Sequence, residues 1–228
     1  MSVRAPIALA ALPLVAAAVA TAPARAVEPY VATGLPYALA GLAQPLGSAF
    51  AVRADFGTIG GHAYSGSTSD NDFRGKLHYD RIALVGDWFA FGGGFRLTGG
   101  LTLNQAKATM RASPHDGKIT IGGVAYDAPS SLYYVQSDLS FPHAMPYLGI
   151  GWGHHGDDTP GFAFNVDLGA GIGKARATPL APSPALASEI ALTSGGAADL
   201  ASENRQFQDE VGKFKAIPQA TLGIGYRF

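Results

Sequence analysis

Strict alternation of apolar residues with small or polar residues most constrains this chain, and it is clearest in the final nine residues, ATLGIGYRF. Leu222, Ile224, Tyr226 and Phe228 share one parity, and Thr221, Gly223, Gly225 and Arg227 share the other. Successive side chains of a strand point to opposite faces, so the pattern predicts a strand with one apolar face and one face of small or polar residues. Chain ends usually fray, so we expect this strand to pair with the first strand and close a sheet.

Segments with the same alternation recur along the chain, separated by turn-rich stretches, as transmembrane β-strands require. We expect eight strands, of which the seventh is poorly patterned: 49–57, 77–88, 95–104, 133–141, 147–153, 162–172, 174–180 and 217–228. Residues 60–71 are expected to form a polar loop, and the long connection 105–131 holds a possible small hairpin at 119–126.

A short amphipathic helix is expected before the last strand, because apolar residues there recur near helical spacing. These residues are Leu200, Phe207, Val211 and Phe214. Such a helix could cap one mouth of a barrel, lie at the membrane interface, or act as a moving gate.

The first residues have the anatomy of a secretory signal peptide. Arg4 precedes an apolar run, and Ala24-Arg25-Ala26 forms a small-x-small cleavage site. The run is short and rich in alanine, whereas a retained span needs roughly 20 strongly apolar residues. We therefore expect a signal peptide at 1–26, a leader segment at 27–48 and a barrel at 49–228.

Composition narrows the fold class further. The chain has 228 residues, no cysteine, 30 glycines and a formal net charge of −1, which argues against a nucleic-acid partner. A sheet that spans lipid must close, because every backbone polar group has to be paired internally. The non-apolar faces hold small residues and isolated charges, which suits a narrow lumen. We predict an all-β, eight-stranded antiparallel transmembrane β-barrel; a soluble lipocalin-like barrel is the alternative.

The parity of the strands assigns a set of charged side chains to the lumen. The set is Arg53, Asp55, Arg81, Asp87, Arg96, Asp138, Asp167 and Arg227. Its positive and negative charges cancel, and ionisable groups in a narrow interior are costly unless they are paired. The set therefore predicts either a salt-bridged plug or a charged constriction that selects small solutes.

No cofactor, metal site or enzyme is expected. His154 and His155, with Asp157 and Asp158, could hold a metal, but neighbouring residues on an extended chain point apart, so a solvated loop is favoured. Acyl transfer needs a serine activated by a histidine, and only Ser65, Ser67 and Ser69 near His62 offer weak candidates. A lipid-modifying enzyme is the alternative function.

The terminal Tyr226-Arg227-Phe228 resembles the C-terminal signature of Gram-negative outer-membrane proteins. PYLGIGWG at 146–153 and FAFNVDLGAGIG at 162–173 are similar to small eight-stranded barrels of the OmpW and CarO neighbourhood. This resemblance implies a monomer, with Tyr226 and Phe228 as the signal that the barrel-assembly machinery recognises. It also implies outer-membrane lipid and lipopolysaccharide as surroundings. The implied function is a narrow conduit for small solutes or a structural, surface-interaction barrel.

Overall fold

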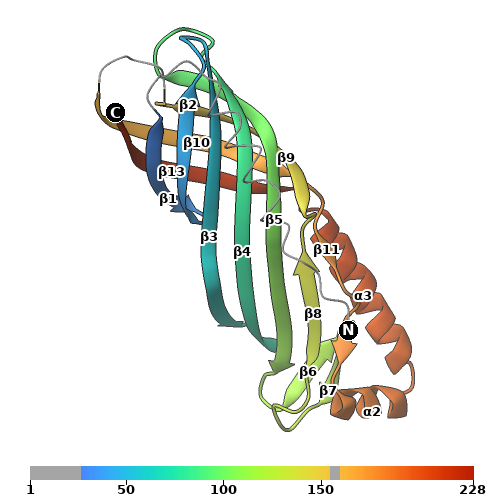
Figure 1. Cartoon of the computed structure of the whole chain (residues 1–228). Helices are drawn as coiled ribbons and strands as arrows, with labels where there is room; N and C mark the ends of the chain where they lie inside the picture. The colour runs from blue at the N-terminus through green and yellow to red at the C-terminus, as the bar shows by residue number, and fades with distance from the viewer. Residues whose placement is uncertain (1–26, 155–159) are drawn as a thin grey trace, which may run out of the picture.

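The computed structural model describes residues 27–154 and 160–228, and these residues form a closed antiparallel ring of eight strands (Figure 1). In ring order the strands are β1 (Glu28–Leu35), β2 (Ala38–Pro45), β3 (Phe50–Ser67), β4 (Asn71–Trp88), β5 (Phe95–Pro114), β9 (Ala144–Trp152), β10 (Gly161–Ile172) and β13 (Ala216–Arg227). The last strand pairs with the first, with Tyr30 opposite Gly225 and Thr33 opposite Leu222. The predicted fold class and the predicted closure by the final strand are confirmed.

The prediction of a leader segment at 27–48 is wrong, because β1 and β2 lie within it and complete the ring. Both strands are short, and Pro29, Gly34 and Gly41 interrupt their alternation. Glycine and proline weaken the strand pattern in a sequence, so the inward residues of β1 were not recognisable by periodicity. The predicted signal peptide, 1–26, lies outside the described residues.

Two of the eight predicted strands, 133–141 and 174–180, are not members of the ring. β5 is 20 residues long; its first half pairs with β9, and its second half pairs with β8 (Val135–Ser140). The predicted seventh strand contains only β11 (Arg176–Ala177), which pairs with β8, as does the nearby β12 (Ala181–Pro182). The predicted number of eight ring strands is correct, but β1 and β2 are the ring members in place of these two segments.

Beyond the ring, β3, β4, β5 and β8 continue as a sheet that we call the extension. Residues 60–71, predicted as a loop, belong mostly to β3 and β4, which stay paired as far as Ser67 and Asp72. A bulge between Thr58 and Gly60 marks the place where β3 leaves the ring. The predicted small hairpin is confirmed as β6 (Lys118–Ile121) and β7 (Val124–Asp127).

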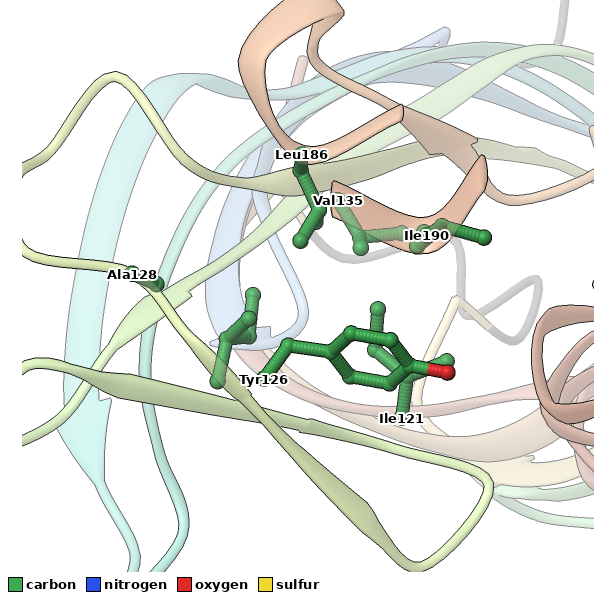
Figure 2. Close-up of a cluster of buried hydrophobic side chains, with 7 residues drawn as sticks. Ile121, Tyr126, Ala128, Val135, Leu186 and Ile190 are labelled. Atoms are coloured by element: carbon green, nitrogen blue, oxygen red, sulfur yellow. The ribbon is translucent and has the colours of Figure 1, made fainter. Parts of the chain in front are cut away.

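Two helices precede the last strand, α2 (Pro184–Leu192) and α3 (Gly196–Gly212), so the expected amphipathic helix is present with a second one before it. Ser183 caps α2 by accepting a hydrogen bond from the backbone N–H of Leu186 at 3.3 Å. The helices pack beside the extension, where the hairpin, β8 and α2 share a small hydrophobic core (Figure 2). Its buried members are Ile119, Ile121, Tyr126, Ala128, Val135, Leu186 and Ile190. No helix in the described ranges has the length and hydropathy needed to cross a membrane.

The two faces of the ring differ sharply. Large apolar side chains stand exposed on the outside, such as Phe162 at 75%, Phe164 at 73% and Leu222 at 60%. Ionised and hydrogen-bonding side chains point inward and are buried. This is the polarity of a barrel with a lipid-facing surface and a polar interior, and it is opposite to that of a soluble sandwich.

Candidate functional site: the closed lumen

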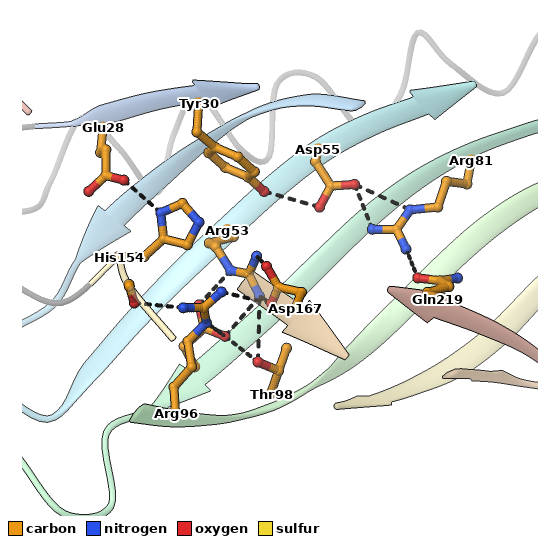
Figure 3. Close-up of polar contacts among 12 residues, drawn as sticks. Glu28, Tyr30, Arg53, Asp55, Arg81, Arg96, Thr98, His154, Asp167 and Gln219 are labelled. Carbon is orange, nitrogen blue, oxygen red and sulfur yellow. Dashed lines mark hydrogen bonds and ion pairs between the residues drawn. The ribbon is translucent and has the colours of Figure 1, made fainter. Parts of the chain in front are cut away.

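The centre of the lumen is filled by an ion-pair network that crosses the ring (Figure 3). Arg53 on β3 bonds Asp87 on β4, with Nε to Oδ2 at 2.5 Å, and Asp167 on β10, with Nη2 to Oδ1 at 3.1 Å. Arg96 on β5 bonds the same Asp167 oxygen from Nη2 at 2.7 Å, and the Thr98 hydroxyl donates to Asp87 at 2.6 Å. Because β3 and β10 lie opposite each other in the ring order, the pair of Arg53 and Asp167 spans the barrel.

A second layer lies next to the centre, toward the extension. Arg81 bonds Asp55, with Nη2 to Oδ1 at 2.6 Å. It also donates to the Tyr37 hydroxyl at 2.5 Å and to the side-chain oxygen of Gln219. Its guanidinium lies 4.9 Å from the centre of the Tyr37 ring, a cation–π contact that adds to the ion pair. This layer joins the turn between β1 and β2 to β3, β4 and β13.

A third layer lies at the end of the ring where the N-terminus of β1 meets the C-terminus of β13. Glu28 on β1 accepts from Arg227 Nη2 at 2.9 Å, and its other oxygen lies 2.7 Å from His154 Nδ1. The side chains of Glu28 and His154 are fully buried. Sequence reasoning missed both residues: Glu28 was placed in a leader and His154 in a solvated loop. No sequence pattern marked Glu28, because it is recognisable as an inward residue only through the pairing of β1 with β13 and β2.

Seven of the eight charges assigned to the lumen from the sequence lie there, buried to 8% exposure or less: Arg53, Asp55, Arg81, Asp87, Arg96, Asp167 and Arg227. Asp138 is the exception, and its assignment is wrong. It lies exposed on β8 in the extension, where Thr109 donates to it at 2.8 Å. Glu28 takes its place, so the buried ionised groups of the described residues are still four arginines and four carboxylates.

Side chains fill most of the space between the first and second layers. A cavity of about 10 Å³ remains in the lumen, lined by residues that include Arg53, Arg81 and Gln219, and this is close to the minimum needed for one water molecule. Toward the extension the lumen ends in an apolar layer with Tyr37 stacked on Tyr79, their ring centres 5.6 Å apart. The rest of this layer is Leu39, Ile59, Ala106, Phe141 and Ile217.

Some hydrogen-bonding capacity in the lumen is unused. Asn165 on β10 is 1% exposed, and neither its Nδ2 nor its Oδ1 has a partner within the described residues. His154 Nε2 is in the same situation. Buried polar groups are normally satisfied by protein or water, so these two side chains mark places where water or a small polar solute could bind.

The described residues give no geometry for a metal site or for nucleophilic catalysis. They contain no group of three potential metal-binding side chains, and His155, Asp157 and Asp158 lie outside them. His62 Nδ1 lies 3.0 Å from the carbonyl oxygen of Ile59, and no serine hydroxyl in the described ranges bonds a histidine ring. Ser65, Ser67 and Ser69 are exposed.

The aromatic residues of the final strand lie on the outside of the ring. Tyr226 packs edge to face on Phe162, with ring centres 5.1 Å apart, and on Phe228 at 5.0 Å. Phe228 is 71% exposed. Arg227, between them, points into the lumen toward Glu28. The strand thus presents an aromatic cluster outward, at the end of the ring where β13 finishes.

No protein-family model and no curated protein matches the sequence, whereas solved structures match the fold, including two from Acinetobacter baumannii. The crystal structure of Acinetobacter baumannii CarO has a TM-score of 0.58 and 10% identity, covering 89% of this chain and 97% of that one. CarO2 of the same organism has a TM-score of 0.59 and 13% identity, covering 90% and 99%. The chain has the CarO barrel fold. At this identity the CarO likeness establishes the fold alone, and the chemistry of the lumen follows from the side chains of this chain.

Proposed function

We propose that this chain is an outer-membrane β-barrel whose lumen is closed to passive flux in its resting state, and that it serves as a structural or surface-interaction barrel. The observation that carries the proposal is the layered ion-pair network, which fills the ring from wall to wall. The apolar outer surface and the CarO fold support the membrane location. The signal peptide at 1–26, with a mature chain from Val27, and the role of Tyr226 and Phe228 in assembly belong to the same proposal.

Closure follows from the pairing of the charges. An ion or solute that enters the lumen must displace an arginine or a carboxylate from a buried partner, which leaves a charge uncompensated. The four positive and four negative groups also cancel, so the lumen offers no net field to attract either sign of ion. We therefore expect no steady passage of ions.

The proposal is tested by liposome swelling with a graded panel of sugars and amino acids, using the refolded mature chain. Liposomes with the protein should swell no faster than empty ones. With a matched variant, Asp87→Ala, liposomes should swell faster, because Arg53 and Arg96 keep only the shared carboxylate of Asp167. Rapid swelling by the wild-type protein, with a size cut-off, would contradict closure.

A narrow conduit for small solutes is the second candidate. The unused hydrogen-bonding atoms of Asn165 and His154 favour it, because they could accept a small polar molecule during a rearrangement. Solute-specific swelling that is lost in Asn165→Leu but retained in Asp138→Ala would select this candidate.

Catalysis is not part of the proposal. The alternative, a lipid-modifying enzyme, predicts a change in the mass of lipid A in cells that express the chain. An unchanged lipid A mass profile is the expected result.

A further inference from the structure

An unusual charge arrangement lies outside the ring, on the outward face of the extension. Arg74 on β4 stands directly opposite Arg111 on β5, and Lys76 is the next residue of β4 on that face, opposite Thr109. Like charges directly opposite each other on neighbouring strands are destabilising. Arg74 and Lys76 are exposed, and neither makes a hydrogen bond or an ion pair within the described residues.

These cations line a cavity of about 910 Å³ on the outward face. Its charged lining residues are Asp72, Arg74, Lys76 and Arg111, so three positive groups face one negative group. Asp72 is itself engaged, since His115 Nδ1 lies 3.1 Å from its Oδ1. The cavity therefore has a net positive lining and a volume well above that of a bound ion.

Arg111 is held in place before any ligand arrives. Its guanidinium carbon lies 3.4 Å from the centre of the Tyr134 ring, and its Nη2 donates to the carbonyl oxygen of Ser131 at 3.2 Å. A planar guanidinium that is already positioned loses less conformational freedom on binding, and it can bind a phosphate through two parallel hydrogen bonds.

The height of the cavity along the barrel is set by the strand register. On the outward face, Phe56, Ile82 and Leu103 lie side by side as the last apolar row, and Thr58, Asp80 and Gln105 form the first polar row. At about 3.3 Å per residue along a strand, Lys76 lies roughly 13 Å and Arg74 roughly 20 Å beyond the polar row. The cations thus lie beyond the apolar band and past its first polar row, and their long side chains can extend back toward the head groups of a surrounding leaflet.

We propose that this cavity binds the phosphate groups of a phosphorylated glycolipid, of the lipid A class, in the leaflet that surrounds the barrel. Arg74, Lys76 and Arg111 donate charge-assisted hydrogen bonds to the phosphate oxygens, and the bound anion relieves the repulsion between the two arginines. The proposal rests on the outer-membrane location proposed above.

The test uses the refolded full-length chain in neutral detergent micelles, with lipid A binding followed by native mass spectrometry. The variant is Arg74→Gln/Lys76→Gln, and the matched control is Arg205→Gln/Lys215→Gln, which removes the same charge from exposed residues elsewhere. We expect the variant to bind lipid A at least about tenfold more weakly, since each charge-assisted hydrogen bond contributes strongly. The control should stay within about twofold of the wild type.

Two further probes identify the source of the phosphate. The wild type and the variant should bind dephosphorylated lipid A with equal affinity. Inorganic phosphate should compete only weakly with lipid A for the wild-type protein. Equal binding by the variant and the wild type, or equal affinity for the dephosphorylated lipid, would overturn the proposal. Tight binding of inorganic phosphate that lipid A does not displace would overturn the choice of a lipid.

A charge reversal separates ligand binding from folding. Arg74→Glu places a carboxylate opposite Arg111, so the lipid-free protein should unfold at the same temperature as the wild type or higher, while lipid A binding is lost. Retained binding in Arg74→Glu would contradict the proposal. The proposed outer-membrane location is tested separately, by cell fractionation. Because the binding titration is done in micelles, its result does not depend on that location.

Discussion

Removing Asp87 is the sharpest perturbation of the lumen, because this carboxylate touches two arginines. Asp87 is 1% exposed, and its oxygens lie 2.5 Å from Arg53 Nε and 3.4 Å from Arg96 Nε. Breaking a buried ion pair by removing one partner costs about 3–5 kcal/mol. Both arginines keep Asp167, and Arg96 also keeps the carbonyl oxygen of Gly153 at 2.6 Å. We therefore expect Asp87→Ala to cost about 3 kcal/mol, the lower part of that range.

The assay is reversible unfolding in urea, with the refolded protein in lipid vesicles and the tryptophan fluorescence of Trp88 and Trp152 as the signal. Asp138→Ala is the matched control, since it removes an exposed carboxylate in the extension and should change the free energy of unfolding by less than about 0.5 kcal/mol. Asp87→Asn should fall between the two, because the amide oxygen can still accept from Thr98. A value for Asp87→Ala within about 1 kcal/mol of the wild type would refute the assignment of a buried, interdependent network.

Four further predictions concern the wall of the ring, the C-terminus and the contact between the hairpin and α3. Ile224→Arg places a charge on the lipid-facing side and should lower the free energy of unfolding in vesicles by about 2–4 kcal/mol. An unchanged free energy of unfolding would show that the lipid-facing and lumen-facing sides of this strand are assigned the wrong way round. At Gly223 even a methyl group would lie 2.5 Å from Asn165 Oδ1, so Gly223→Ala should reduce the yield of heat-modifiable barrel. Deleting Phe228 should slow assembly in cells, and insertion at wild-type yield would argue against its role as a signal. Burial, together with Asp199, raises the pKa of Tyr126 to about 12, above its usual value of about 10. The unfolded chain then ionises first, so stability should fall from pH 10 to 12, and Tyr126→Phe should make that slope shallower by the share of one titrating group.

The periodicity of the sequence was enough to predict the fold class and the inward face of most of the ring. It assigned Arg53, Asp87, Arg96 and Asp167 to the lumen because each alternates with apolar neighbours in a long strand. Alternation fixes which way a side chain points, but it does not say which strand pairs with which. On β8 the assigned parity is inverted: Val135 and Ser137 are buried, whereas Asp138 lies exposed opposite Thr109 of β5. Because β8 pairs with the far half of β5, its side chain also lies outside the ring.

The segments that the sequence could not predict are those in which pairing overrides local preference. The stretch 60–71 is rich in glycine, serine and aspartate, and such composition favours a loop. It is nevertheless mostly strand, because the ladder between β3 and β4 continues beyond the ring and satisfies its backbone groups. Glu28 was missed for a related reason, since β1 is recognisable only through its pairing with β13 and β2.

The central claim is that the lumen is closed by paired charges, and single-channel conductance of the refolded full-length chain in planar bilayers tests it most directly. We expect no steady current for the wild type at any moderate voltage in potassium chloride. Asp87→Ala should instead give brief openings, because Arg53 and Arg96 are then held by one shared carboxylate, that of Asp167. A large, stable and ion-selective current through the wild-type protein would contradict the closed lumen and would require an open pore.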